Sequence, residues 1–359
     1  MIQNGEVLHD YFAVREGGGK LALTLAAARR WPIVAGFVSP RLSVREEWPT
    51  VTLRELGVRP GVPPSRSVSL TRRWSKYRSG ADALVYSGTY APMAALNQRD
   101  AYNILYCHTP PRFIYDQKDF YLASLQVWQR PLFLALIRYL RPRYEAAVAC
   151  MDRIIVNSEN VRRRVQRHLG CSSTVVYPPC DVRRYRWQEP EGYYLSVARL
   201  DILKRVDRIV EAFKGLPDKK LVVVSDGAQR SRLESLAENS PNINFLGEIS
   251  DERLRDLLGR CIGTIYVPRD EDFGMSPVES MAAGKPVVGV AEGGLLETLV
   301  DGETGYLLPP EFEVDDLVDA VSRLTAGRAE KMRAACEERA RLFDTETFLQ
   351  QMESVVNGR

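Results

Sequence analysis

The sequence predicts an α/β fold built from two doubly wound domains, each with a parallel sheet that carries helices on both faces. Short apolar segments rich in Val, Ile and Tyr alternate with helical segments along the 359 residues. Continuous apolar runs of this kind are typical of strands buried in a parallel sheet. The length fits about two domains. Residues 177–192, where prolines interrupt the periodicity, separate two similar series of elements.

The first half alternates strands and helices in the order expected of a doubly wound sheet. Its helices are expected at 18–30 and 160–169. Its expected strands are residues 5–10, 31–38, 82–88, 102–109, 153–158 and 174–179.

The second half repeats the pattern with more regular spacing. Its expected helices are residues 205–215, 230–239, 251–260 and 276–284. Its expected strands are residues 192–199, 219–226, 243–247, 263–268, 286–290 and 305–310.

Charge is divided unevenly between the halves. Residues 1–186 hold 28 Lys and Arg against 14 Asp and Glu, a net +14, whereas residues 187–359 hold 21 against 32, a net −11; together they give +3. A basic half is typical of a protein that faces phosphate groups or an anionic lipid surface, and it is also compatible with a plain solvated surface. A basic half alone could also bind nucleic acid, but no nucleic-acid-binding motif accompanies it.

The sequence indicates a cytoplasmic protein. No apolar run reaches the roughly 18 residues expected of a membrane-spanning helix, and the first residues lack the features of a signal peptide. The six cysteines are scattered without metal-ligand spacing, which indicates reduced thiols.

The segment "RDEDFGMSPVESMAAGKP", residues 269–286, is the most informative stretch of the chain. The run Asp270, Glu271 and Asp272 could chelate a divalent ion. Alternatively, the glycine and the helix that follow form a helix N-terminus that binds an anion through backbone N–H groups. Ser276 and Glu279 have the spacing of a capping box, with Pro277 at the first helical position.

A second candidate follows the first strand of the second half, in "ARLDILKR", residues 198–205. Arg199 and Lys204 stand beside the start of a helix. A guanidinium and an ammonium near a helix N-terminus suit a diphosphate, although both could be ordinary surface cations.

These motifs together resemble glycosyltransferase family 4. Residues 271–310 contain the two glutamates with seven residues between them, the helix, "GKPVV" and a "GG..E...G..G.L" pattern, and residues 196–213 resemble the motif that precedes them. The resemblance covers residues 193–325. The first half matches more loosely, through the glycine run 17–19 and "YCHTPPRFIYD", which is most like bacterial O-antigen and exopolysaccharide mannosyltransferases.

The resemblance implies a GT-B fold and a retaining glycosyltransferase that needs neither metal nor cofactor. It implies an acceptor domain at residues 1–184, to which residues from about 342 to 359 return, and a nucleotide-sugar domain at residues 185–341. Glu271 and His108 are implied at the reacting sugar. The residues implied to bind the nucleotide sugar are Gly18, Gly19, Arg199, Lys204, Phe273, Gly274, Met275, Ser276 and Glu279. GDP-mannose is the first donor expected, followed by UDP-sugars.

The expected acceptor is a lipid-diphosphate-linked glycan or polysaccharide precursor. Residues 113–148 combine aromatics, leucines and arginines and predict either a helix in the surface of an anionic membrane or a core helix pair broken at Pro131 and Pro142. The protein would then be peripheral on the inner face of the cytoplasmic membrane. A nucleotide-sugar epimerase on the same fold and a non-catalytic lipid- or glycan-binding module remain the alternatives.

Overall fold

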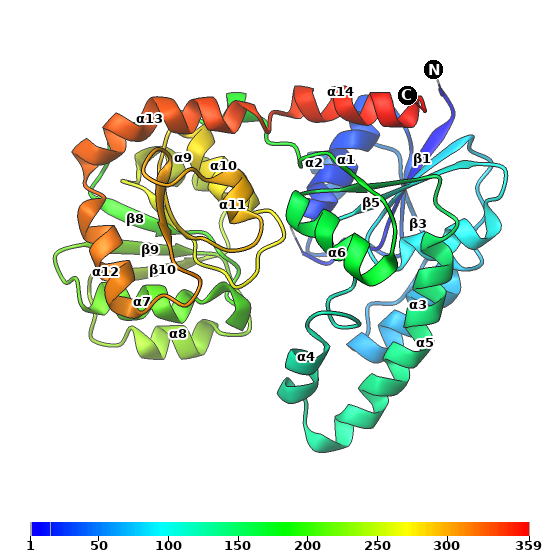
Figure 1. Ribbon diagram of the computed structural model, residues 1–359, viewed down its shortest axis with the longest axis horizontal. Helices are drawn as coiled ribbons and strands as arrows, with labels where there is room; N and C mark the ends of the chain where they lie inside the picture. Colours follow the sequence, from blue (N-terminus) through cyan, green and yellow to red (C-terminus); the bar gives the residue numbers. More distant parts are fainter. Residues whose placement is uncertain (1, 15, 359) are drawn as a thin grey trace. The chain divides into compact units, whose positions relative to one another are not determined.

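The computed structural model of the protein describes residues 2–14 and 16–358. It divides into two compact units, Met1–Pro178 with Phe348–Arg359, and Pro179–Thr347. Each unit is an α/β domain with one parallel sheet (Figure 1).

The first unit contains a sheet of seven parallel strands in the order β3-β2-β1-β4-β5-β6-β7. Its helical elements connect successive strands, and α1, α3 and α6 contribute buried side chains to the core. The strands are β1 (Gly5–His9), β2 (Ile33–Ala35), β3 (Leu53–Glu55), β4 (Ala83–Ser87), β5 (Tyr102–Cys107), β6 (Arg153–Val156) and β7 (Thr174–Val175). The helices are α1 (Gly17–Arg29), α2 (Val44–Glu47), α3 (Pro63–Trp74), η1 (Ala91–Asn97), α4 (Lys118–Ser124), η2 (Val127–Gln129), α5 (Arg130–Val148) and α6 (Glu159–Leu169).

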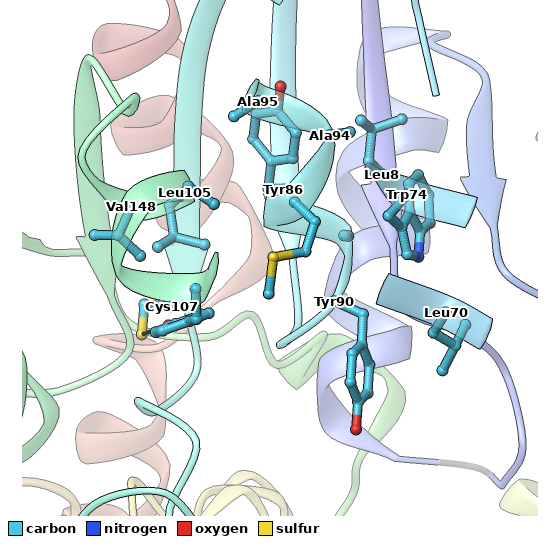
Figure 2. Packing of buried hydrophobic residues seen from close by; sticks show 14 of the residues in the cluster. Leu8, Leu70, Trp74, Tyr86, Tyr90, Ala94, Ala95, Leu105, Cys107 and Val148 are labelled. Carbon is cyan, nitrogen blue, oxygen red and sulfur yellow. Dashed lines mark hydrogen bonds between the residues drawn. The ribbon is translucent and has the colours of Figure 1, made fainter. Parts of the chain in front are cut away.

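Both faces of this sheet are buried. Leu8 and Tyr86 point into one apolar cluster together with Trp74, while the neighbouring Val7 and Val85 point into the other. This alternation follows from the two-residue period of a strand. Figure 2 shows the first cluster.

The second unit contains six parallel strands in the order β10-β9-β8-β11-β12-β13. The strands are β8 (Tyr193–Ser196), β9 (Lys220–Val224), β10 (Ile243–Gly247), β11 (Thr264–Ile265), β12 (Val287–Val290) and β13 (Gly305–Leu308). The helices are η3 (Val182–Arg184), η4 (Ile202–Lys204), α7 (Val206–Lys214), α8 (Arg230–Leu236), α9 (Asp251–Arg260), α10 (Met275–Ala282), α11 (Leu295–Thr298), α12 (Val314–Arg323) and α13 (Ala326–Arg341).

The predicted doubly wound α/β architecture is confirmed. Every expected strand contains an observed one, and only the three-residue edge strand β3 was not anticipated. The expected break at Pro142 is wrong, since α5 continues through it. Pro131 stands at the start of α5, where it removes no helical hydrogen bond.

The boundary between the units lies a few residues before the expected 184/185. The reason is that the backbone of Cys180 donates to Phe343 O over 2.8 Å and forms a bridge with Asp344, both in the second unit. The last helix, α14 (Thr345–Val356), then returns to the first unit. There Phe348 and Met352 join its apolar core.

Within the described residues, no helix has the length and apolar character needed to cross a membrane.

Candidate functional site

The strand order of each sheet reverses once, and the candidate residues gather at these two points. In the second unit the reversal lies between β8 and β11, and in the first between β1 and β4. The connections after the two central strands of such a sheet run in opposite directions, which leaves a crevice beyond their carboxyl ends. Sequence-distant loops therefore meet there.

In the second unit, Lys204 from η4 and Glu271 from the loop after β11 form an ion pair. The Lys204 ammonium donates to Glu271 Oε2 over 2.5 Å and to the hydroxyl of Tyr266 over 3.1 Å, and that hydroxyl donates to the same carboxylate oxygen over 2.9 Å. The two charged side chains are only 19% and 16% exposed. Sequence reasoning missed Tyr266, which lies inside the expected strand 263–268 but directly after the shorter observed strand β11.

This ion pair holds Lys204 in its charged form. Burial lowers the pKa of Lys204, but the interactions with Tyr266 and Glu271 outweigh it, so the pKa lies above the ordinary value. Burial also raises the pKa of Tyr266, and the charge of Glu271 adds to this rise, so the phenol stays protonated and can donate. The two contacts use two of the three N–H donors of the ammonium. One donor remains for a ligand oxygen.

Arg199 lies at the other end of the turn that carries Lys204. Asp201 caps this turn by accepting from Leu203 N over 3.0 Å, and its second oxygen accepts from Arg199 Nε over 3.0 Å. The Arg199 side chain is 58% exposed. Lys204 is therefore joined to Glu271, whereas Arg199 projects toward solvent beside Asp201, and a diphosphate held by both cations stays a prediction.

Helix α10 begins one residue before the expected start. Gly274 is its N-cap, with φ of 97°, and no side chain caps it. The predicted capping box is therefore wrong, because Ser276 is already the second helical residue. Only glycine takes this left-handed conformation without strain. The first backbone N–H groups, at Met275 and Ser276, have no partner within the helix and can donate hydrogen bonds to an anion.

Two glycines allow the acidic loop to pack tightly against the chain after β12. A Cβ atom on Gly294 would lie 2.4 Å from Asp272 O, and one on Gly274 would lie 2.7 Å from Leu295 Cδ2. Phe273 is buried and packs edge-on against Phe343, with ring centroids 5.4 Å apart. Only the backbone of Phe273 can therefore face a ligand.

Glu279 lies inside α10, and its side chain is hydrogen-bonded to Tyr185. Sequence reasoning did not single out Tyr185. Burial raises the pKa of Tyr185, and the charge and the hydrogen bond of Glu279 raise it further. The phenol therefore stays protonated and orients the carboxylate.

The geometry does not favour the alternative in which Asp270, Glu271 and Asp272 chelate a metal ion. Among residues 2–14 and 16–358, no three His, Cys, Asp or Glu side chains converge as a metal site would need. The carboxylate of Glu271 is engaged by Lys204 and Tyr266. Independence from metal ions stays a prediction.

In the first unit, the half-buried His108 is linked to two buried polar residues, Ser87 and His9. Ser87 Oγ lies 2.9 Å from His108 Nε2 and 3.0 Å from His9 Nδ1. Burial lowers the pKa of His108 to about 4. Burial and the neighbouring His108 lower that of His9 to about 3. Both imidazoles are thus neutral near pH 7, and Ser87 can relay one hydrogen bond between them.

Gly18 and Gly19 lie directly over these two rings. The glycine run 17–19 forms the first turn of α1, which begins one residue before the expected helix 18–30. A Cβ atom on Gly18 would lie 3.2 Å from His108 Nε2, and one on Gly19 would lie 3.7 Å from His9 Nε2. The structure therefore brings Gly18, Gly19 and His108 together. The bare backbone of the glycines leaves room that a side chain would fill.

Asp10, which the sequence did not single out, fixes the end of β1. Its carboxylate accepts from the backbone N–H groups of Thr89, Tyr90 and Ala91 at 2.6 to 2.7 Å. Burial raises the pKa of Asp10 to about 7, although these three hydrogen bonds act in the opposite direction. Asp10 thereby ties the end of β1 to the loop that follows Ser87.

The comparisons with known proteins concern the fold and the sequence of the second unit. The fold is shared with sucrose-phosphate synthase of Thermosynechococcus elongatus, with TM-score 0.80 and 19% identity, where the match covers 99% of this chain and 98% of the other. It is shared with Anabaena HepE in complex with UDP-glucose, with TM-score 0.75 and 18% identity over 99% and 100% of the two chains. Residues 181–343 match the family model described as "Glycosyl transferases group 1".

The chain has the GT-B fold. The chain is 24% identical over 308 residues to alpha-1,3/1,6-mannosyltransferase ALG2 of Dictyostelium discoideum, across 70% of this chain and 69% of the relative. It spans about half of the corresponding yeast protein, 51%, at 26% identity. The family match lies in the unit that holds Lys204 and Glu271.

Proposed function

We propose that the chain transfers a hexose with retention of configuration from a nucleotide sugar to a lipid-diphosphate-linked glycan or polysaccharide precursor. The observation that carries this proposal is the Lys204–Glu271 pair with Tyr266 beside the uncapped N-terminus of α10. GDP-mannose is the first candidate donor, which the name of the mannosyltransferase relative supports. A UDP-sugar is the second, which the UDP-glucose complex of a structural neighbour supports.

The chemistry follows from where charge develops. When the glycosyl–phosphate bond breaks, negative charge grows on the departing diphosphate and positive charge on the sugar ring. Lys204, Arg199 and the amides of Met275 and Ser276 would stabilise the diphosphate, and one such fixed donor contributes on the order of 3 kcal/mol to lowering a barrier. The departing phosphate can take the acceptor proton on the same face, so no enzyme nucleophile is required.

The carboxylates would serve the hydroxyl groups of the donor. A carboxylate accepts hydrogen bonds from hydroxyls. Glu271 would bind hydroxyls of the sugar and Glu279 those of the ribose. In this role Glu271 orients the sugar and forms no covalent bond to it. His108, neutral at pH 7, would accept or donate one hydrogen bond at the reacting sugar.

The donor can be tested by calorimetry with GDP-mannose and UDP-glucose, followed by transfer to a lipid-diphosphate-linked glycan. We expect one of these donors to bind and the product to keep the anomeric configuration of the donor. Inversion would refute retention. An epimerised nucleotide sugar formed without acceptor would identify an isomerase, and absence of nucleotide binding would leave the lipid- or glycan-binding module as the better function.

We further propose that the segment 118–143 contacts an anionic membrane surface. Half of the twelve large exposed apolar side chains of the described residues lie in it: Phe120, Tyr121, Val127, Trp128, Leu132 and Leu134. Val127 and Trp128, at 75% and 73% exposure, form the turn between α4 and α5 (Figure 1).

Charge on α5 complements this apolar turn. Farther along the helix, Arg138, Arg141 and Arg143 are exposed. An apolar end followed by arginines matches the acyl boundary and the anionic head groups of a bilayer. The indole N–H of Trp128 donates to Gln126 Oε1 over 3.3 Å, so the ring presents its apolar face with its donor satisfied.

Flotation with vesicles tests this contact. The protein should float with vesicles of phosphatidylglycerol and phosphatidylcholine at low salt, and less at high salt because the arginine contribution is screened. Replacement of Val127 and Trp128 by serine should abolish flotation. Leu342→Ser, which changes a side chain exposed to 53%, serves as the control. Equal flotation of both variants would refute the assignment.

A further inference from the structure

Arg205, the residue after Lys204, has an unusual backbone conformation. Its φ is 51°, in the left-handed region that favours glycine. A non-glycine residue there carries backbone strain. Its side chain is nevertheless largely buried, with 13% exposure. Contacts of that side chain must offset the strain.

The guanidinium of Arg205 binds three backbone carbonyls. Nε donates to Val267 O over 2.7 Å, Nη2 to Pro268 O over 2.9 Å, and Nη1 to Pro310 O over 3.2 Å. The guanidinium also lies 4.9 Å from the ring centroid of Phe312. The planar fork of an arginine suits several acceptors at once. Arg205 thus fixes the start of the loop that carries Glu271.

Glu292 extends this contact to the next residues of the loop. Its Oε2 lies 3.4 Å from Arg205 Nη2, and its Oε1 accepts from Asp270 N over 2.6 Å. Asp270 is itself left-handed, with φ of 49°. Glu271 O then accepts from Gly294 N over 2.8 Å, close to Glu292 in the chain.

We infer that Arg205 and Glu292 are positioning residues that hold the loop 267–271 so that the Glu271 carboxylate meets the donor sugar. The functional part of this inference rests on the proposed role of Glu271. The two residues touch the loop backbone and act on the reaction only through Glu271. A displacement of about 1 Å at a reacting group can cost roughly a hundredfold in rate, so loss of this clamp should lower turnover.

Hydrogen exchange of the protein without ligand tests the clamp independently of the donor. Arg205→Gly keeps the favourable left-handed backbone but removes the guanidinium. We expect at least tenfold faster exchange at the Asp270 amide with little change in the unfolding midpoint. Arg208→Ala removes an exposed arginine whose ion pair, to Glu211, lies elsewhere on the surface, and should leave that amide unchanged. Unchanged exchange in Arg205→Gly would overturn the inference.

Steady-state kinetics with the donor that the wild type accepts test the functional consequence. We expect Arg205→Gly to lower kcat roughly tenfold to a hundredfold while the Kd for GDP or UDP changes less than threefold. Arg205→Lys keeps the positive charge but lacks the planar guanidinium. It should therefore recover less than half of the kcat that Arg205→Gly loses. The variant with both Arg205→Gly and Glu292→Gln should be no slower than Arg205→Gly, because residues that act as a unit are not additive.

The outcomes separate the two proposals. If GDP-mannose and UDP-glucose both fail to bind the wild type, the proposed function fails. Hydrogen exchange at the Asp270 amide still tests whether Arg205 and Glu292 hold the loop 267–271. If the wild type is active and Arg205→Gly keeps its kcat, the positioning role is refuted and the proposed function stands. If Arg205→Gly does not fold, both hydrogen exchange at Asp270 and kcat are measured in Arg205→Lys instead. The inference is refuted if that variant shows the exchange rate and the kcat of the wild type.

Discussion

The ammonium of Lys204 and the carboxylate of Glu271 lie 2.5 Å apart, although 67 positions separate them in the chain. The pair unites a cation suited to a diphosphate with an acceptor suited to a sugar hydroxyl. It also means that either residue, when replaced, leaves a partly buried charge without its partner, which is costly. Substitutions of Lys204 and Glu271 must therefore keep the shape of the side chain that they replace.

Glu271→Gln keeps the shape of the side chain and removes its charge. We expect turnover to fall by roughly a hundredfold to a thousandfold, the range measured when one fixed polar group is lost from a catalytic site. Affinity for GDP or UDP, which lack the sugar, should change less than threefold. Calorimetry and initial rates measure the two effects, and Lys204→Met, which should weaken nucleotide binding as well, provides the contrast. Full turnover in Glu271→Gln would contradict its assigned role.

Arg199→Gln should weaken nucleotide diphosphate binding without affecting the fold. The side chain is exposed and its ion pair with Asp201 contributes little, so the unfolding free energy should change by less than about 0.5 kcal/mol. We expect roughly tenfold weaker binding of GDP or UDP, the scale of one charge-assisted contact. Arg232→Gln, equally exposed and also paired with an aspartate, is the matched control. Identical affinities in both variants would remove Arg199 from the site.

Gly18→Ala should disturb His108. The added methyl group would lie 3.2 Å from Nε2 and 3.3 Å from Cε1 of that ring, closer than ordinary contact allows. We expect at least a tenfold loss of kcat/KM, since small displacements at a reacting centre are expensive. Gly327→Ala is the control, because Gly327 is also the second residue of a helix and has nothing within 4 Å. That variant should gain about 0.5 to 1 kcal/mol of stability and keep its activity.

His9 should make the first unit less stable in acid. Its pKa is about 3 in the folded protein against 6.5 in the unfolded chain, so the unfolded chain binds more protons as the pH falls below 6.5. The unfolding free energy should therefore decrease by about 1.4 kcal/mol per pH unit between roughly pH 6 and pH 4 from this residue. Asp10, whose pKa is raised, contributes with the opposite sign.

The comparison with His9→Asn isolates this contribution, because Asp10 is present in both proteins. Asparagine can keep the hydrogen bond to Ser87 and does not titrate. Denaturation measured at several pH values should show the variant losing less stability on acidification than the wild type. Parallel pH profiles would show that His9 is not neutral in the fold.

The sequence by itself determined the two parallel sheets and the glycosyltransferase motif of the second half. Both are local properties: strands buried on both faces need continuous apolar runs, and the segment 269–286 keeps its loop, glycine and helix contiguous. Lys204 and Glu271 could be selected for the same reason, since each lies in the segment between an expected strand and the helix that follows it.

Only the tertiary structure decided which side chains meet. Tyr266 joins Lys204 and Glu271, Tyr185 orients Glu279, and Glu292 reaches the amide of Asp270. These partners come from separate segments of the second unit, and no spacing along the chain encodes such a meeting. The residue at which α10 begins also depended on the tertiary structure. Gly274 takes its left-handed conformation where it packs against Leu295, which follows the next strand. Packing between distant segments, rather than local propensity, selected the N-cap there.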